Sequence, residues 1–165
     1  LDVFGVQERY LQLAAFEFTS DRKRMSVVVR NVATGAVRLY CKGADDAIMA
    51  RLRTGQEGTV ATVQRHIDAY AEAGLRTLVM SYRDVTAEEY AAFRAEYDRA
   101  AAALIDRDAA KEAVYTIMER DMCLLGATAI EDKLQSAVPE TIALLKQAGA
   151  SLWMLTGDKF STALT

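Results

Sequence analysis

Alternating apolar and polar positions dominate the first quarter of the chain and predict β-structure. Residues 27–29 are three consecutive valines, and apolar residues at 37, 39 and 41 alternate with polar or aromatic ones. β-Branched residues in such a pattern favour strands, so we expect three strands between about residues 10 and 41. Thr34–Gly35 is a turn signal between the last two, which predicts a hairpin and an antiparallel sheet.

Apolar residues at steps of three and four then predict helices over residues 45–53, 59–73 and 106–119, and a further helix that opens after Thr86. Thr86 and Glu89 have the spacing of a capping box, and residues 76–82 form a strand between the helices. The residues expected to face the core from the last two helices are Tyr90, Phe93, Tyr97, Leu104, Ala110, Val114, Ile117 and Met118.

The pattern changes near residue 121. An apolar strand over 122–129, a helix over 136–148 and a second apolar strand over 151–155 predict a βαβ unit, which is usually parallel. We expect Val138, Ile142 and Leu145 to face inward. The predicted fold is therefore α+β: residues 1–125 form an antiparallel sheet with flanking helices, and residues 126–165 begin an α/β domain.

Composition excludes some classes of protein. The chain has 165 residues, 52% of them apolar, which is enough for a substantial core, and its net charge of −3 gives no reason to expect nucleic-acid binding. Cys41 and Cys123 are far apart and suit free intracellular thiols. The sequence contains no apolar run of about 18 residues and no signal peptide. Because it starts without Met, we expect a piece of a longer protein.

The charged turn after Phe16 is the first candidate functional site. It places the Phe18 ring within a few residues of three cations, Arg22, Lys23 and Arg24. A ring can stack on a flat base and cations can meet phosphates, so the turn suits a nucleotide site. The alternative is a solvated hairpin tip with Phe18 in the core, since charged turns of this kind are common.

Three further positions could meet a phosphate. Lys42 can act as a mobile point charge, and Gly43 after it lets the backbone approach a ligand closely. Arg76 follows the glycine that ends a helix and could bind phosphate with two hydrogen bonds. Each also suits an ordinary exposed residue at a strand end. Thr156–Asp158 follows an apolar strand and could be a phosphoryl loop or a plain turn. His66 has no partner ligands nearby, so no metal site is predicted.

Four motifs taken together identify a family. FEFTSDRKRM at residues 16–25, KGAD at 42–45, GLRTL at 74–78 and TGDK at 156–159 resemble, in this order, the P-type ATPases, and most closely their phospholipid flippase branch. The resemblance implies part of the nucleotide-binding domain, running into a haloacid-dehalogenase-like phosphorylation domain.

The resemblance also implies roles for individual residues. Phe18 matches the adenine-stacking phenylalanine, Lys42 the pocket lysine and Arg76 an arginine near the phosphates and ribose. Asp132 resembles the hinge aspartate between the two domains. Arg22 and Arg24 are expected to be solvated or to face the sheet rather than the ligand. The other positions implied at the nucleotide site are Ser20, Lys23, Gly43, Thr156, Gly157 and Asp158.

Two catalytic motifs of the family are missing from this sequence. The family's phosphorylated aspartate lies in DKTGT, and Mg²⁺ is held there and at GDGxND; neither motif is present, so we expect no turnover from this chain alone. The resemblance implies ATP as ligand and a parent at the cytosolic face of a membrane that moves phospholipid, with a small accessory membrane subunit as a further partner.

Three other interpretations of the sequence remain open. The first is a cation-transporting P-type ATPase, although such pumps usually have proline where this chain has Asp45. The second is a free-standing module that binds nucleotide or a partner without catalysis. The third is a soluble haloacid-dehalogenase-like phosphatase, which the missing nucleophile motif disfavours.

Overall fold

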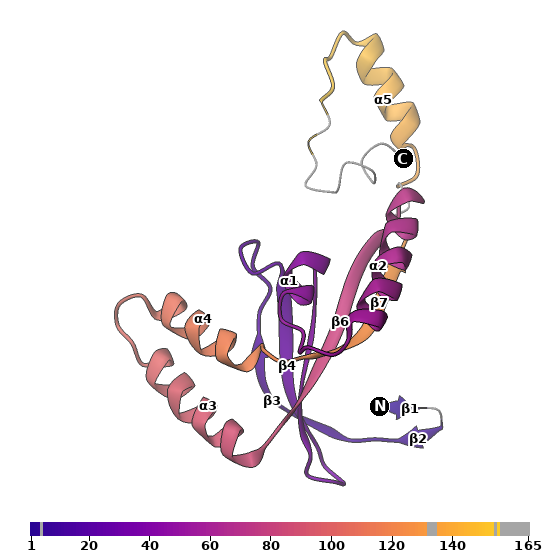
Figure 1. Cartoon of the computed structure of the whole chain (residues 1–165). Helices are drawn as coiled ribbons and strands as arrows, with labels where there is room; N and C mark the ends of the chain where they lie inside the picture. The colour runs from indigo at the N-terminus through magenta and orange to yellow at the C-terminus, as the bar shows by residue number, and fades with distance from the viewer. Residues whose placement is uncertain (4, 132–134, 154, 156–165) are drawn as a thin grey trace.

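The computed structural model describes residues 1–3, 5–131, 135–153 and 155 (Figure 1). Within these residues, five strands form one antiparallel sheet in the order β3-β4-β5-β6-β7. The strands are β3 (Tyr10–Phe16), β4 (Arg24–Asn31), β5 (Val37–Gly43), β6 (Arg76–Val85) and β7 (Cys123–Ile130). A separate short ladder pairs β1 (Asp2–Val3) with β2 (Val6–Gln7).

The helices follow the strands in a simple order. A short α1 (Asp45–Met49) and α2 (Glu57–Glu72) lie between β5 and β6, and the pair α3 (Ala87–Ala101) and α4 (Arg107–Met118) lies between β6 and β7. The last described helix is α5 (Val138–Gln147). In Figure 1, α3 and α4 run side by side as an extended hairpin that projects from the sheet.

Helices cover only one face of the sheet. In β4 the residues alternate between buried (Arg24, Ser26, Val28) and half-buried positions, as a strand between two unlike environments must. The buried set joins one core that includes Ile48 of α1 and Ile67 of α2, together with residues of α3 and α4. No described helix packs on the opposite side. We name the two sides the covered face and the open face.

Most of the predicted elements are confirmed. The three early strands, the four helices from α1 to α4 and the strand β6 all form where the pattern places them. The capping box is complete: the backbone NH of Glu89 donates to the Thr86 hydroxyl at 3.2 Å, and the NH of Thr86 donates to the Glu89 carboxylate at 3.0 Å. Apolar periodicity and cap chemistry therefore agree with the observed helix start.

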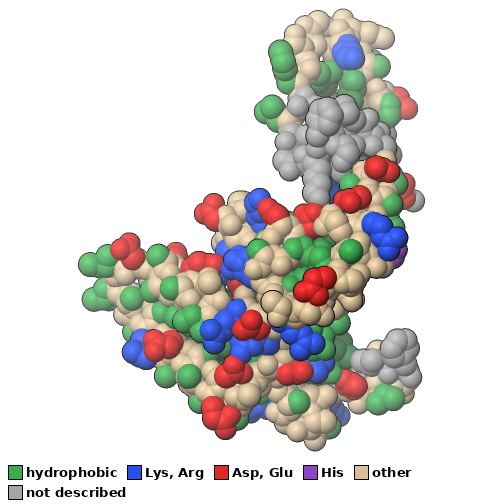
Figure 2. All heavy atoms as spheres, viewed as in Figure 1, with side chains coloured by type: hydrophobic (Ala, Val, Ile, Leu, Met, Phe, Trp, Pro, Cys, Tyr) green, Lys and Arg blue, Asp and Glu red, His purple; other side chains and the backbone are tan. Residues whose placement is uncertain are grey.

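Two residues expected in the core from the segment between β6 and β7 are instead at the surface. Leu104 is fully exposed, because α3 ends at Ala101 and Leu104 lies in the turn to α4 (Figure 2 shows apolar side chains at this tip). Ile117 is 54% exposed and borders a hollow between α3 and α4. By contrast, Phe93, Val114 and Met118 are buried as predicted.

The strand β7 differs from the expected βαβ arrangement. It pairs antiparallel with β6, from Arg76 opposite Ile130 to Tyr82 opposite Cys123, and so completes the main sheet. The predicted helix after it exists as α5, but residues 151–153 and 155 are not in a strand. Ile142 and Leu145, expected inward, are 41% and 42% exposed. The second strand of the predicted βαβ unit is therefore the part that is wrong for these residues, because a short apolar run does not by itself establish a strand.

Candidate functional site

The register of the sheet brings the predicted site residues to one end. Arg24 pairs with Gly43, and Gly43 pairs with Val79, so the β3–β4 turn, the end of β5 and the start of β6 lie together. Six of the residues proposed from the sequence are at this end of the sheet: Phe18, Ser20, Lys23, Lys42, Gly43 and Arg76. Topology thus gathers residues that are far apart in the chain.

A cavity of about 260 Å³ opens at this end of the sheet. Its walls combine apolar side chains of the open face with Lys42, the one cation among its lining residues. The lining residues are Met25, Ser26, Val27, Tyr40, Cys41, Lys42, Met80, Ser81 and Leu125. An apolar hollow with a single charge at its border suits a flat aromatic group that carries an anionic extension.

Gly43 is required by the protein's own backbone. A Cβ at this position would lie 2.4 Å from the Lys23 carbonyl oxygen and 2.6 Å from the Arg24 Cβ. A close backbone approach at Gly43 is therefore made to Lys23 and Arg24 at the start of β4. Gly43 lets the β3–β4 turn lie directly against the end of β5, where the NH of Ala44 donates to the Lys23 carbonyl at 2.9 Å.

The β3–β4 turn is held by its own hydrogen bonds. The NH of Lys23 donates to the Thr19 carbonyl at 2.9 Å, and the NH of Arg22 donates to the Thr19 hydroxyl at 3.2 Å. Lys23 has a φ of +51°, in the left-handed region. Its ammonium pairs with Asp46 at 2.9 Å, and this hydrogen bond and the carboxylate charge raise the pKa of Lys23.

The other predicted residues have different surroundings. Phe18 is 59% exposed and Ser20 is exposed on the same turn, and neither borders the cavity. Exposure also removes the alternative in which Phe18 belongs to the core. Arg76 is an exposed residue at the start of β6. Of the remaining candidates, Thr156–Asp158 and Asp132 lie outside the described residues.

The charged turn contains one arrangement that sequence reasoning missed. Arg22 and Arg24 are 6% and 3% exposed, so they are not solvated. They face the covered side and meet Glu112 and Glu119 at α4. Strand alternation was a usable signal for Arg24, which shares one side of β4 with Ser26 and Val28. Arg22 precedes the strand, and nothing local marked Glu119 as the buried partner of either arginine.

Charges on the surface are mixed rather than segregated. Figure 2 shows acidic and basic side chains interspersed over the face in view. Within the described part of the chain, no group of three or more metal-ligating side chains gathers. Nor is any described helix long and apolar enough to cross a membrane.

Comparison with known proteins agrees with this architecture. A family model for the P-type ATPase cytoplasmic domain N matches residues 1–137. The chain therefore belongs to the P-type ATPase family.

Among curated relatives, "Phospholipid-transporting ATPase DNF1" of Chaetomium thermophilum is 46% identical over 99% of this chain and 10% of its own length. "Phospholipid-transporting ATPase 10" of Arabidopsis thaliana is 48% identical over 96% of this chain and 13% of its own. "Phospholipid-transporting ATPase ID" of Homo sapiens is 46% identical over 97% and 13%. The chain thus spans about a tenth of the length of these relatives.

Proposed function

We propose that this chain is the ATP-binding cytosolic part of a P-type ATPase that translocates phospholipids. The observation that carries the proposal is the cavity bordered by Lys42, at the sheet end where the β3–β4 turn also lies. Apolar walls can take up the adenine base by removing its faces from water. A lysine at the border can neutralise the charge of the phosphates.

Each residue at this end has a proposed task. The exposed Phe18 ring is available to stack on the base from the turn, and Lys42 meets the nucleotide at the cavity. Arg76 lies at the start of β6 and can bind phosphate or ribose oxygens. Lys23 and Ser20, exposed on the turn at this end of the sheet, are proposed to meet the nucleotide from outside the cavity. Gly43 contributes indirectly, by letting the turn approach β5.

The second part of the chain completes the proposal. We assign residues 1–125 to the nucleotide-binding domain and residues 126–165 to the beginning of the phosphorylation domain, although β7 crosses this division as one strand of the sheet. Thr156, Gly157 and Asp158 are proposed to contact the γ-phosphate region, and Asp132 to act at the hinge. Mg²⁺ would neutralise the phosphates, held by the DKTGT and GDGxND motifs that this sequence lacks.

The activity of the whole protein is inferred from the relatives. They are named as phospholipid-transporting ATPases, so we propose phospholipid as the transported substrate and the cytosolic face of a membrane as the location. A small accessory membrane subunit is a further proposed partner. The main competing proposal is a cation pump, which Asp45 after Lys42–Ala44 and the names of the relatives disfavour.

Titration of the chain with ATP tests the proposed site. Nuclear magnetic resonance shifts or calorimetry would be measured for the parent chain and for Phe18→Ala and Lys42→Ala. Arg38→Ala is the matched control, because Arg38 is on the same strand and the same face as Lys42 but lies at the other end of the sheet. We expect Phe18→Ala and Lys42→Ala each to weaken ATP binding about tenfold, and Arg38→Ala to change it little.

Two results would contradict the proposal. Equal loss of affinity in Lys42→Ala and Arg38→Ala would mean that only overall charge matters. No saturable binding by a folded parent chain would mean that these residues do not form a nucleotide site here. Circular dichroism of each variant separates loss of binding from loss of fold.

A further inference from the structure

The side of α4 that faces the sheet lies under the β3–β4 turn. We name residues 17–23 the nucleotide loop. Glu112 and Tyr115 of α4 and Glu119 at its C-terminus lie at steps of three and four and so share one side of the helix. We propose that these three side chains hold the nucleotide loop in its ATP-binding position, which makes Glu119 and Glu112 positioning residues. This inference rests on the proposed function.

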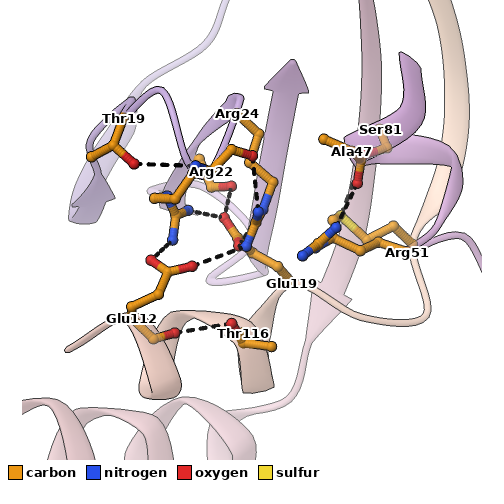
Figure 3. A network of polar contacts seen from close by, with 11 residues as sticks. Thr19, Arg22, Arg24, Ala47, Arg51, Ser81, Glu112, Thr116 and Glu119 are labelled. Carbon is orange, nitrogen blue, oxygen red and sulfur yellow. Dashed lines mark hydrogen bonds and ion pairs between the residues drawn. The ribbon is translucent and has the colours of Figure 1, made fainter. Parts of the chain in front are cut away.

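Glu119 is the centre of the contacts. Its carboxylate is buried and accepts from Arg22 Nη2 at 2.6 Å, from Arg24 Nε at 2.7 Å and from the Ser26 hydroxyl at 2.5 Å (Figure 3). Two of these donors lie at or next to the loop, and the third continues along β4. One carboxylate therefore ties the loop and the first turn of the strand to the end of α4.

Glu112 closes the ion cluster from the solvent side. It is 39% exposed and pairs with both Arg22 and Arg24, the latter at 3.2 Å. Arg24 Nη1 also donates to the Arg22 carbonyl at 3.0 Å, so the cluster holds the loop backbone as well as its side chains. Figure 3 shows both guanidinium groups directed at the two carboxylates.

Tyr115 holds the loop from both of its ends. The Phe16 ring, just before the loop, stacks on the Tyr115 ring at 4.1 Å. The Arg22 guanidinium, near the end of the loop, lies 5.2 Å from the centre of the same ring. Such cation–ring and ring–ring contacts are directional, so they fix the position of the loop as well as adding stability.

The Lys23 side chain is oriented differently from its two neighbours, Arg22 and Arg24. Arg22 and Arg24 both turn toward α4, whereas the Lys23 side chain between them is exposed and pairs with Asp46. The left-handed backbone of Lys23 is sustained by these neighbours. Charged groups are costly to bury, and a pure packing role would be met by apolar residues. The cluster therefore suits a role in fixing one loop geometry.

The test compares two ion pairs with the same exposure. Glu112→Gln weakens the cluster under the loop, and Glu89→Gln weakens the Arg83–Glu89 pair, where glutamine still completes the capping box. Side-chain exposures are 5% and 39% for Arg22 and Glu112, and 12% and 37% for Arg83 and Glu89. Glu119→Gln, at the buried centre of the same cluster, is expected to disrupt the contacts more than Glu112→Gln.

Three quantities would be measured on the 165-residue chain: the thermal midpoint, the Kd for ATP, and the backbone amide shifts and relaxation of residues 17–23 without ATP. We expect Glu112→Gln and Glu89→Gln to lower the midpoint similarly. Only Glu112→Gln should loosen the nucleotide loop and weaken ATP binding, by about tenfold. Glu119→Gln, if it folds, should show the larger loss.

Each other outcome has a definite meaning. An unchanged Kd and an unchanged loop in Glu112→Gln overturn the inference and leave the proposed function standing. Equal loss of affinity in Glu89→Gln also overturns it, since stability alone would explain the effect. If the parent chain binds no ATP, the proposed function fails, and the loop measurements alone decide whether α4 holds residues 17–23.

Discussion

Cationic side chains have opposite surroundings on the two faces of the sheet. On the covered face, Arg22 and Arg24 are buried and paired with two carboxylates. On the open face, Lys42 borders a cavity, while Lys23 in the β3–β4 turn is exposed and pairs with the exposed Asp46. Three of these four cations are consecutive in the chain. Their contacts separate them into a buried pair held by carboxylates and an exposed pair.

This difference shows how burial decides the role of a cation. A buried guanidinium needs acceptors inside the protein, and the covered face supplies carboxylates for Arg22 and Arg24, with Arg22 Nε left without a partner among the described residues. An exposed ammonium keeps its water shell and can exchange it for phosphate oxygens. The covered face should therefore govern stability, and the open face should govern affinity for ATP.

The largest expected effect is on the covered face. Glu119→Ala leaves Arg22 and Arg24 buried without their main acceptor, which should lower the free energy of unfolding by about 3–5 kcal/mol. Urea unfolding followed by circular dichroism measures it.

Lys42→Ala on the open face is the variant to compare with Glu119→Ala. It should change the free energy of unfolding by less than about 0.5 kcal/mol, because the side chain is exposed. Similar losses in both variants would remove the contrast between the faces.

The next effect concerns the contact between β5 and the turn. Gly43→Ala places a Cβ against the Lys23 carbonyl oxygen and the Arg24 backbone, so the two strands must move apart. We expect a loss of roughly 1–3 kcal/mol in unfolding free energy.

Gly58→Ala is the control for this change. Gly58 lies in the first turn of α2 with no atom within 4 Å of its Cβ position, so alanine should stabilise the helix by up to about 1 kcal/mol. A neutral Gly43→Ala would show that β4 and the end of β5 can separate freely.

The sequence predicted the elements well and their partners less well. Strand alternation and helix periodicity placed β3 to β6 and α1 to α4, and the Thr86 cap was correct in detail. These are local signals. The predicted strand over 151–155 was wrong for residues 151–153 and 155, because a short apolar run does not by itself establish a strand.

The candidate site shows the same limit. Motifs predicted a group of residues, and register brings the described ones to one sheet end. The sequence left open whether Arg22 and Arg24 are solvated or face the sheet, since their partners Glu112 and Glu119 lie about ninety residues further along. A buried ion cluster is a long-range contact, and no periodicity in one segment can reveal it.

A smaller effect is expected at high pH. Burial, followed by the hydrogen bond with Tyr97, raises the pKa of Tyr115 from 10.0 to about 12. Between these values the unfolded chain loses the proton that the folded chain keeps, so this tyrosine makes stability fall as pH rises. Tyr115→Phe should reduce the fall in urea midpoint between about pH 8 and about pH 11. Parallel curves for the two proteins would rule out this contribution.

The smallest expected change in stability is at Lys23. Its pair with Asp46 is exposed on both sides, at 57% and 61%, so solvent and salt screen it. Lys23→Ala should leave the urea midpoint unchanged within error, while the neighbouring Arg22→Ala, which removes a side chain bound to both Glu112 and Glu119, lowers it clearly. The affinity for ATP should respond to Lys23→Ala, because this ammonium is exposed in the turn proposed to meet the nucleotide. A clear loss of stability in Lys23→Ala would show that the exposed cation also holds the turn, and that exposure does not divide the two roles.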